Sequence, residues 1–472
     1  MKRRGAVLLF AVAAAVGLYG VPAGATGSHG SHDVHGHVLV VDKDAHHRHT
    51  CYGKYHRVFP AIQLAVNAAD SGDTIKVCPG IYEETVKVET PDLTILGANA
   101  GRDATGDWRG PESIVQGTPG ANGPGVVQLR ADDITWDGFT VHGTPEAQNS
   151  PGMYTSPKFS GYLIRDTIFK DNGNGIHLGA SGDHPTLVCR NRFTANNEFE
   201  DATGAFGIYS NEGAKQILIT SNLFERHNAA AVFFADQGAE QRDILIEHNK
   251  SVDDMSFATI FNSTRLRVTA NSIQGRVNDP DFKGPASAIF IGANNDDIVV
   301  QKNKVTSTTG NGIDITDTGG DGGPGPWPTN VIVRNNKVRN AELSGIEVSA
   351  TGVGEYQVLH NRSLHNTDYG VHFAPGTNGG TVTGNLALDN RVDCRDRSTD
   401  GPLNHWTDNI GRTALPAGIC AAPTTLDNNR AEYGGKTHDK KEFKRHKQHH
   451  KKMKKHKQHR PDPCVCTLPW RF

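Results

Sequence analysis

Eight side chains that could carry chemistry recur at one position of a repeated strand pattern. The pattern reads Gly-Ile-x-Ile or a close variant, and alternation with a period of two turns its aliphatic residues inward and x outward. In chain order, the residues at x are His177, Tyr209, Phe233, Phe261, Phe290, Asp314, Glu347 and His372. The outward face is therefore predicted to carry an aromatic stripe, then two carboxylates, then a histidine.

Asp314 and Glu347 are the predicted acid–base pair of this face. If their strands are neighbours in one sheet, the two residues lie roughly 4.8 Å apart. Two carboxylates at that distance do not ionise together easily, so the pKa of one rises toward the range that a general acid needs. A separation of about 5 Å also suits a retaining glycosidase. His372 is placed to orient or deprotonate a partner, and His177 is an auxiliary candidate.

The aromatic stripe offers flat faces on which sugar rings stack. It consists of Tyr209, Phe233, Phe261 and Phe290. A second interpretation treats the row as ordinary sheet surface with its phenylalanines covered by loops, because outward polar residues are usually only hydrated and acid pairs can be structural. The sequence leaves a substrate platform and a plain surface as alternatives.

A long Asp/Gly-rich insertion follows Asp314. Residues 316–328 (TDTGGDGGPGPWP) contain Asp317, Asp321 and Trp327. Loops longer than a dozen residues tend to carry function. The two aspartates are candidate calcium ligands through their oxygens, and Trp327 adds an aromatic surface for substrate beside the acids. Asp/Gly turns are also common without a metal, so the sequence does not decide whether calcium binds.

The elements that must position these residues are short strands arranged in a repeat. An Asn follows an apolar, β-branched run at intervals of 22 to 33 residues, at Asn191, Asn222, Asn249, Asn271, Asn303, Asn336, Asn361 and Asn385. The shortest interval fits one coil of a solenoid whose stacked coils bury a continuous core, and longer intervals are coils with inserted loops. An Asn at the same corner of each coil can form a ladder that satisfies backbone groups at the bend.

Other repeat folds fit this pattern less well. A leucine-rich repeat would need regular leucines, and a propeller blade would need roughly 40 residues or more. Before the repeat, residues 59–69 place apolar residues at helical spacing and are followed by the turn Asp70-Ser71-Gly72-Asp73. We therefore predict an all-β fold, a right-handed parallel β-helix with an N-terminal capping helix.

Residues 59–97 (FPAIQLAVNAADSGDTIKVCPGIYEETVKVETPDLTILG), with the Asn coils behind them, resemble the pectin-lyase-like superfamily. The first part of this segment is similar to the start of pectinesterases and of periplasmic β-helix proteins associated with copper-enzyme maturation. The resemblance covers roughly residues 55–420 and implies the fold, not an activity. The catalytic strings of pectinesterases, polygalacturonases and pectate lyases do not occur in this chain.

The chain divides by composition into four parts. Residues 1–25 have a basic start, an apolar run and a small-residue cleavage site, which is typical of a signal peptide. Residues 26–50 are rich in Gly, Ser and His and are predicted to be a mostly disordered linker. The β-helix is expected over residues 51–425, and a disordered Lys/His-rich tail over 426–472. The apolar run is short for a bilayer, so we predict a secreted protein without a membrane span.

Seven cysteines fit an oxidising compartment. Cys51 and Cys78 flank the start of the folded body, and Cys394 and Cys420 flank its end, so each pair is a predicted disulfide. Cys189 lies inside a strand-like run and is expected to be a buried thiol.

The C-terminal tail is strongly basic, whereas the body is acidic. Residues 436–460 carry twelve Lys and Arg against two acids. The tail either only solubilises the protein or is attracted to polyanions such as acidic cell-wall polymers. It lacks the interleaved aromatics of nucleic-acid binders. Histidines on both flanks suit weak zinc or copper binding but fit no closed motif. Cys464 and Cys466 are too close for an unstrained mutual disulfide, and their state stays open.

Two functional classes follow from these features. The first is a polysaccharide hydrolase or lyase that uses Asp314 and Glu347. The second is a non-catalytic binding protein of the cell envelope that uses the same face or the basic tail. A lyase acting on polyuronates would need a bridging calcium beside so acidic a ladder, so hydrolysis or plain binding is favoured. We expect a monomer whose partner is a polysaccharide or cell-wall polymer.

Overall fold

The computed structural model describes residues 36–45, 49–117, 124–143, 151–197, 205–235, 239–276, 286–320, 322–398, 403–425 and 427. The chain divides into two units, residues 1–35 and 36–472, and all described residues belong to the second. The description below concerns that second unit.

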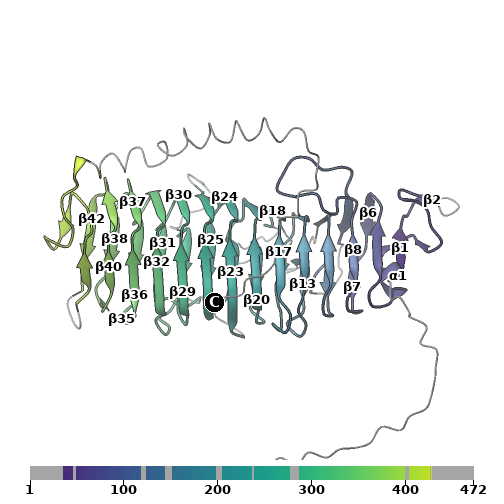
Figure 1. Ribbon diagram of the computed structural model, residues 1–472, viewed down its shortest axis with the longest axis horizontal. Coiled ribbons are helices and arrows are strands. Elements are labelled where there is room, and N and C mark those ends of the chain that lie inside the picture. Colours follow the sequence, from purple (N-terminus) through teal and green to yellow (C-terminus); the bar gives the residue numbers. More distant parts are fainter. Residues whose placement is uncertain are drawn as a thin grey trace, which may run out of the picture. The chain divides into compact units, whose positions relative to one another are not determined.

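Short strands wind through three parallel sheets, which each coil visits in the order A, B, C (Figure 1). Sheet A contains, in spatial order, β4 (Val58–Phe59), β1 (Val38–Val41), β5 (Thr74–Val77), β8 (Thr94–Leu96), β11 (Thr135–Asp137), β14 (Leu163–Arg165), β17 (Thr186–Cys189), β20 (Lys215–Thr220), β23 (Gln241–Glu247), β26 (Ser263–Thr269), β29 (Asp296–Gln301), β32 (Thr329–Arg334), β36 (Tyr356–Leu359), β40 (Thr381–Thr383) and β43 (His405–Thr407).

Sheet B contains β6 (Gly80–Glu83), β9 (Ser113–Gln116), β12 (Phe139–His142), β15 (Ile168–Lys170), β18 (Arg192–Thr194), β21 (Leu223–Glu225), β24 (Lys250–Asp254), β27 (Ser272–Gly275), β30 (Lys304–Thr308), β33 (Lys337–Ala341), β37 (Arg362–Leu364) and β41 (Leu386–Leu388).

Sheet C contains β7 (Val86–Val88), β10 (Val127–Leu129), β13 (Pro151–Thr155), β16 (Asn174–His177), β19 (Phe206–Ser210), β22 (Ala230–Phe234), β25 (Ser256–Ile260), β28 (Ile289–Ile291), β31 (Ile313–Ile315), β34 (Ile346–Val348), β38 (Tyr369–Phe373), β42 (Val392–Asp396) and β44 (Ala414–Leu415). Two small pairs lie outside these sheets, β2 (His49–Thr50) with β3 (Gly53–Lys54), and β35 (Gly352–Val353) with β39 (Thr377–Asn378). The predicted right-handed parallel β-helix is confirmed.

Alternation along each strand builds the core and turns the candidate residues outward. In β31, Ile313 and Ile315 are fully buried, and Asp314 between them lies on the outer face. β34 has the same pattern around Glu347. The inward aliphatic side chains form one apolar cluster through the stacked coils, so burial of this face fixes which residues point out.

The predicted asparagine ladder is confirmed at the corner between sheets A and B. Oδ1 of Asn303 accepts hydrogen bonds from the backbone N–H and the side-chain amide of Asn271, at 2.9 and 3.0 Å. The Asn303 amide donates to the carbonyl of Val268 at 2.8 Å and to Oδ1 of Asn336 at 3.1 Å. This arrangement repeats along the ladder, whose members are Asn191, Asn222, Asn249, Asn271, Asn303, Asn336, Asn361, Asn385 and Asn409.

The corner between sheets A and B has the same length in successive coils. From β17–β18 to β40–β41, two residues join the strands, and the second of them is the ladder Asn. The first has a positive φ, for example +55° at Arg190 and +57° at Lys302. A positive φ raises the conformational energy of any residue that has a side chain, and the buried hydrogen bonds of the ladder stabilise the turn against this strain. Longer connections occur at the other corners, as between β27 and β28 and between β31 and β32.

A second ladder, which was not predicted, closes the corner between sheets B and C. It runs through Asn172, Asn196, His227 and Asp254. Nε2 of His227 lies 3.1 Å from the Asn196 amide, and its Nδ1 lies 2.7 Å from Oδ1 of Asp254. All four side chains are buried. Because the members differ in residue type, no repeated Asn marks this ladder in the sequence.

The predicted linker over residues 26–50 is wrong at its C-terminal end. Val38–Val41 forms β1, which pairs with β4 and β5 inside sheet A. Three of its four side chains are buried, and the strand adds a rung to the core between β4 and β5. The β-branched run VLVV was hidden by the His- and Gly-rich residues around it. The folded body therefore starts before residue 51.

The N-terminal helix is shorter than the helical spacing over residues 59–69 indicates. It is α1 (Ile62–Asn67), and it lies at the N-terminal end of the stack (Figure 1). The backbone N–H groups of Ile62 and Gln63 donate to the Glu84 carboxylate at 2.8 Å, which satisfies donors that the helix itself leaves unpaired. Its role as a cap stays a prediction.

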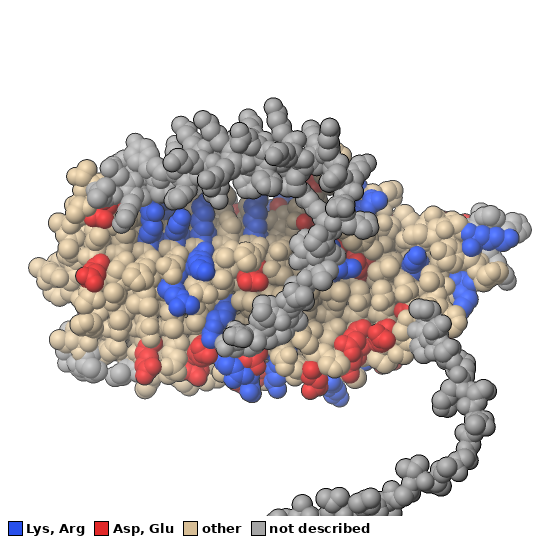
Figure 2. Space-filling view, viewed as in Figure 1, with Lys and Arg blue, Asp and Glu red and all other residues tan. Residues whose placement is uncertain are grey.

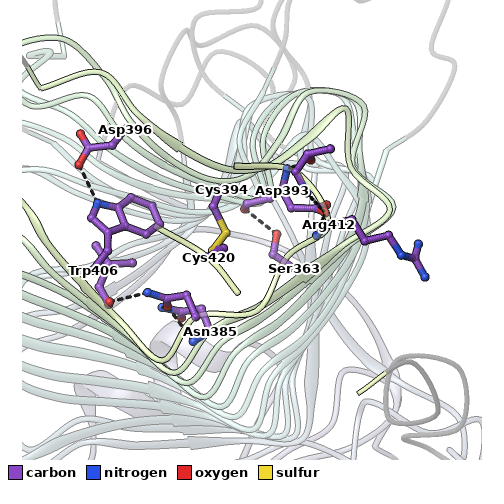
Figure 3. The surroundings of a disulfide bond; sticks show 12 residues. Ser363, Asn385, Asp393, Cys394, Asp396, Trp406, Arg412 and Cys420 are labelled. Carbon is purple, nitrogen blue, oxygen red and sulfur yellow. Dashed lines mark hydrogen bonds between the residues drawn. A yellow bond between two sulfur atoms is a disulfide. The ribbon is translucent and has the colours of Figure 1, made fainter. Parts of the chain in front are cut away.

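Both predicted disulfides, Cys51–Cys78 and Cys394–Cys420, are present. Figure 3 shows the second, close to Trp406, whose Nε1 donates to Oδ2 of Asp396 at 2.7 Å. Each disulfide joins a terminal segment to a neighbouring coil. Cys189 is buried, as predicted.

Some predicted segments lie outside the described residues. These are the signal peptide over residues 1–25, the tail over 426–472 apart from Asp427, and with it Cys464 and Cys466. Within the described part of the chain, no helix has the length and apolar character needed to cross a bilayer.

Candidate functional site

The outward positions predicted from the sequence form a ladder on sheet C. In spatial order, it reads His177, Tyr209, Phe233, Thr259, Phe290, Asp314, Glu347 and His372. The predicted adjacency of Asp314 and Glu347 is therefore confirmed. Phe261 is the exception, because it lies two residues beyond Thr259 and is 4% exposed. The segment Phe-Ala-Thr-Ile-Phe offers two outward residues, and the pattern selected the wrong one.

A groove of about 490 Å³ runs over this face and is open to solvent. Strands β19, β22, β25, β28 and β31 form its floor, and the loop after β31 contributes to one wall. Its lining is mostly apolar and consists of Phe206, Ala229, Ala230, Phe233, Met255, Ser256, Thr259, Phe261, Ala286, Ser287, Phe290, Asp314, Gly319, Gly320 and Gly322.

Four phenylalanines form a continuous aromatic surface in the groove. The ring centroids of Phe206 and Phe233 are 4.7 Å apart, and those of Phe233 and Phe261 are 5.9 Å apart. Phe290 follows, with its centroid 5.6 Å from that of Phe261. These distances are typical of interacting aromatic pairs, so the rings support one another as a rigid surface.

Among the described residues that line the groove, Asp314 is the one that carries a charge. Its Oδ2 accepts hydrogen bonds from the hydroxyl of Ser287 at 3.0 Å and from the amide of Asn311 at 2.9 Å. The amide oxygen of Asn311 accepts the backbone N–H of Ser344 at 2.9 Å. That bond fixes the orientation of the Asn311 amide, because its NH₂ group must then face the carboxylate. Asp314 is held in one orientation from two neighbouring coils.

The environment of Asp314 favours its protonated form. Burial raises the pKa of this carboxyl, and the charge of Glu347 raises it further. The hydrogen bonds from Asn311 and Ser287 oppose this effect. Together these influences raise the pKa of Asp314 from an ordinary 3.8 to about 6. A carboxyl with that pKa can hold a proton and release it near neutral pH, as a general acid must.

Glu347 and His372 form a close pair next to Asp314 on the ladder. Nδ1 of His372 lies 2.7 Å from Oε1 of Glu347, and their side chains are only 6% and 14% exposed. Neither ring nitrogen of His372 makes a hydrogen bond of good geometry with a described residue. The Tyr369 ring packs against the imidazole with a centroid distance of 4.3 Å. The pair lies on strands beyond the groove lining, so of the three predicted catalytic residues only Asp314 lines the groove.

His177 and Tyr209 continue the ladder at its other end, outside the groove lining. Nε2 of His177 lies 2.8 Å from Oδ1 of Asn211, and its ring centroid lies 5.1 Å from that of Tyr209. Burial lowers the pKa of His177, against the opposing effects of Asn211 and Glu212. The neutral imidazole is thereby favoured, which suits a packing and hydrogen-bonding role for this residue.

The loop after β31 reaches the groove through Gly319, Gly320 and Gly322, and its predicted ligand Asp317 is not part of the lining. Trp327 is 46% exposed and lies over Gly352, outside the groove lining. Oδ2 of Asp317 accepts the hydroxyl and the backbone N–H of Thr351. Asp321 lies outside the described residues.

The calcium site predicted at Asp317 and Asp321 stays a prediction. Among the described residues, the one cluster with metal-ligand spacing is Asp42, Cys51 and Cys78. Its two cysteines form a disulfide, so they offer no thiolates to a metal.

Sequence reasoning missed several residues of the site, four of which matter most for its geometry. Phe206 and Thr259 line the groove, and Ser287 and Asn311 hold Asp314. The sequence does hold a signal for Asn311, because it precedes Asp314 by only three residues and can reach its carboxylate locally. Ser287 contacts Asp314 from the previous coil after a long insertion, and no sequence signal marks that contact.

The raised pKa of Asp314 predicts a pH-dependent contribution to stability. The folded state favours the protonated carboxyl, so this stabilisation is full below about pH 4 and is lost as the pH rises through about 6. Asp314→Asn cannot titrate there. We expect the stability of the variant, relative to wild type, to increase by roughly 1–2 kcal/mol between pH 4 and 7. Urea unfolding at several pH values measures this, and a pH-independent difference would contradict it.

A family model agrees with this architecture, and solved structures of known proteins show distant similarity. The family described as "Right handed beta helix region" matches residues 154–321 and 206–387. The A-module of a mannuronan C-5 epimerase from Azotobacter vinelandii is 14% identical, with 77% of this chain and 94% of that chain covered and a TM-score of 0.42. An α-1,3-glucanase catalytic unit from Streptomyces thermodiastaticus is 15% identical, with 75% and 66% covered and a TM-score of 0.41.

An alginate lyase from a Paenibacillus species is 12% identical, with 74% of this chain and 96% of that chain covered and a TM-score of 0.37. A comparison with curated protein sequences gave no match. The family match spans the coils whose strands form the groove.

Proposed function

We propose that this chain, a right-handed parallel β-helix protein of the pectin-lyase-like superfamily, binds a polysaccharide in the groove of sheet C and cleaves it. The observation that carries the proposal is Asp314, a carboxyl with a pKa of about 6, fixed in a groove whose described lining is mostly apolar and aromatic. Open grooves admit an extended polymer, whereas small ligands are usually enclosed.

The aromatic surface supports a carbohydrate ligand. Sugar rings present apolar C–H faces that pack on aromatic side chains, and their hydroxyls need only a few polar partners. Phe206, Phe233 and Phe290 supply such faces along the groove, and Ser256 and Thr259 supply hydroxyl groups between them. A chain bound along these rings would run over the strands toward Asp314.

The proposed chemistry is acid-assisted cleavage of a glycosidic bond. Asp314 holds a proton and donates it to the oxygen of the leaving sugar as the bond breaks. Glu347, its neighbour in register, is the second carboxylate: its oxygen bonds to the sugar carbon as the leaving oxygen departs, and water then displaces it and completes hydrolysis. The charge of Glu347 also keeps the pKa of Asp314 raised. His372 positions Glu347 through their 2.7 Å contact.

Plain binding is the second candidate function. It is favoured by the position of Glu347 and His372, which are largely buried and lie outside the groove lining. In that case, the two residues only stabilise sheet C, and the aromatic groove binds the polymer without turnover.

We further propose that the protein acts outside the cell. The predicted signal peptide and the two disulfides, one at each end of the solenoid, support export to an oxidising compartment. The monomeric state and an attraction of the basic tail to polyanions also remain proposals.

The test is product release from a panel of neutral and acidic polysaccharides, followed as reducing ends and as ultraviolet absorbance of unsaturated products. We expect Glu347→Gln to lower turnover roughly a hundredfold. Glu355→Gln is the matched control, because this acid is exposed and lies outside the ladder. Binding without release from any polymer would replace cleavage by the binding function, and neither binding nor release would refute both.

A further inference from the structure

A row of lysine side chains crosses the outer face of sheet B, away from the groove. Lys250, Lys304 and Lys337 occupy the first positions of β24, β30 and β33, and strand register aligns them, with Ser272 of β27 between the first two. Arg362 of β37 takes the next position. At about 4.8 Å per strand, the row is about 19 Å long. Lys250, Lys304 and Lys337 are termed the lysine strip.

The lysines of the strip are exposed and lack acidic partners among the described residues. Two acids at neighbouring positions of sheet B are already engaged. Glu225 contacts Arg192 at 2.7 Å, and Asp253 contacts Arg276 at 3.6 Å. The positive charge of the strip is therefore not balanced within the described fold. Because like charges on neighbouring strands repel one another, an anionic ligand would relieve an unfavourable interaction.

Further basic residues widen the strip on both sides. Lys302 precedes the ladder residue Asn303, Arg334 ends β32, and Arg339 occupies the third position of β33. Lys302 and Arg334 are exposed. Figure 2 shows Lys and Arg side chains gathered in a row along the upper part of this face, over the strands that Figure 1 labels β24 to β37. The positive charge is therefore concentrated on this part of a body that is acidic in total.

We propose that the lysine strip binds an acidic polysaccharide, a polymer that carries carboxylates at regular intervals. The charges are complementary, and a straight row of cations on a regular sheet suits an extended polyanion. A nucleic acid fits less well, because no aromatic side chain lies among the strip residues to stack on its bases. The strip therefore attaches the protein to an anionic matrix.

The strip acts separately from the groove. Among the described residues, no Lys or Arg lines the groove, and its one charged side chain is Asp314. The described groove lining therefore offers a polyanion no cationic partner, whereas the lysine strip on sheet B offers three. The inference does not rest on cleavage in the groove, and a failed activity test would leave it intact.

The test measures the affinity of the full-length protein for polygalacturonate, with dextran as the neutral polymer. We compare wild type with the triple variant Lys250→Gln, Lys304→Gln and Lys337→Gln. A second triple variant, Lys43→Gln, Lys54→Gln and Lys158→Gln, changes the net charge equally at exposed lysines elsewhere. The basic tail is present in all three proteins, so its contribution is common to them.

We expect the strip variant to bind polygalacturonate roughly tenfold more weakly at low salt, with the difference shrinking at high salt. The control triple variant is expected to change the affinity by less than about twofold, and binding to dextran is expected to be the same in all three proteins.

Three results would overturn the inference. Equal losses in the two triple variants would show that binding follows net charge rather than the strip. An unchanged strip variant would place the polyanion elsewhere. A larger loss of affinity for duplex DNA than for polygalacturonate would assign the strip to nucleic acid. Equal thermal midpoints of all variants establish that only the surface charge has changed.

Discussion

Replacing Asp314 by asparagine is expected to reduce polysaccharide turnover roughly 10³-fold. The asparagine amide has nearly the shape of the carboxyl and can keep the contacts to Ser287 and Asn311, but it has no proton to donate to the leaving oxygen. The aromatic lining does not change, so affinity for the polymer is expected to stay within about threefold of wild type. Single-turnover rates with a binding isotherm separate the two effects.

The pH profile of turnover gives a second measure of the role of Asp314. A general acid is active while protonated, so turnover should fall as the pH rises through about 6, the pKa of Asp314. The Glu347 charge raises that pKa. In Glu347→Gln, the residual turnover should therefore begin to fall at a lower pH than in wild type. Glu355→Gln should keep the wild-type profile. An Asp314→Asn protein with full activity would remove Asp314 from the chemistry.

Replacing Asn303 by alanine is expected to lower the free energy of unfolding by about 4 kcal/mol. The substitution removes four side-chain hydrogen bonds. Buried polar groups of Asn271, Val268 and Asn336 then lose a hydrogen-bond partner. The substitution also removes the support of the turn in which Lys302 has a positive φ. Urea unfolding followed by circular dichroism measures the loss.

Ser272→Ala is the matched control for the ladder prediction. Ser272 is exposed and directly follows the ladder residue Asn271, so its substitution removes a side chain from the same corner without breaking a rung. Its effect should stay within about 0.5 kcal/mol. Equal losses for Asn303→Ala and Ser272→Ala would show that the ladder does not dominate stability at this corner.

The architecture could be predicted because its main determinant is repeated. From β17–β18 to β40–β41, the ladder residue returns in each coil at a corner of two residues, so a period appears in the sequence even though coil lengths differ. β1 was missed for the opposite reason. Val38–Val41 forms a single rung beside an unusual composition, and its partners β4 and β5 lie on both sides of the helix in sequence order. One strand without a repeat carries no periodic signal.

The candidate site was predicted in part because strand alternation fixes only the direction of a side chain. Alternation placed Asp314 and Glu347 on one face correctly, and strand register made them neighbours. It did not determine which outward residue of β25 joins the ladder, and therefore Phe261 was placed where Thr259 lies. The contacts of Ser287 and Phe206 depend on insertions whose paths are set by tertiary packing.

The corners of this solenoid differ in how far their length can vary in the sequence. From β17–β18 to β40–β41, the Asn ladder and its two-residue turns form a spine of constant length, and one extra residue there would shift a whole coil. The corners that flank sheet C already accommodate longer connections, as after β27 and β31. Loops grafted at these rims could therefore reshape the groove for a different ligand while the spine and the core stay unchanged, which makes this solenoid a suitable scaffold for engineered binding sites.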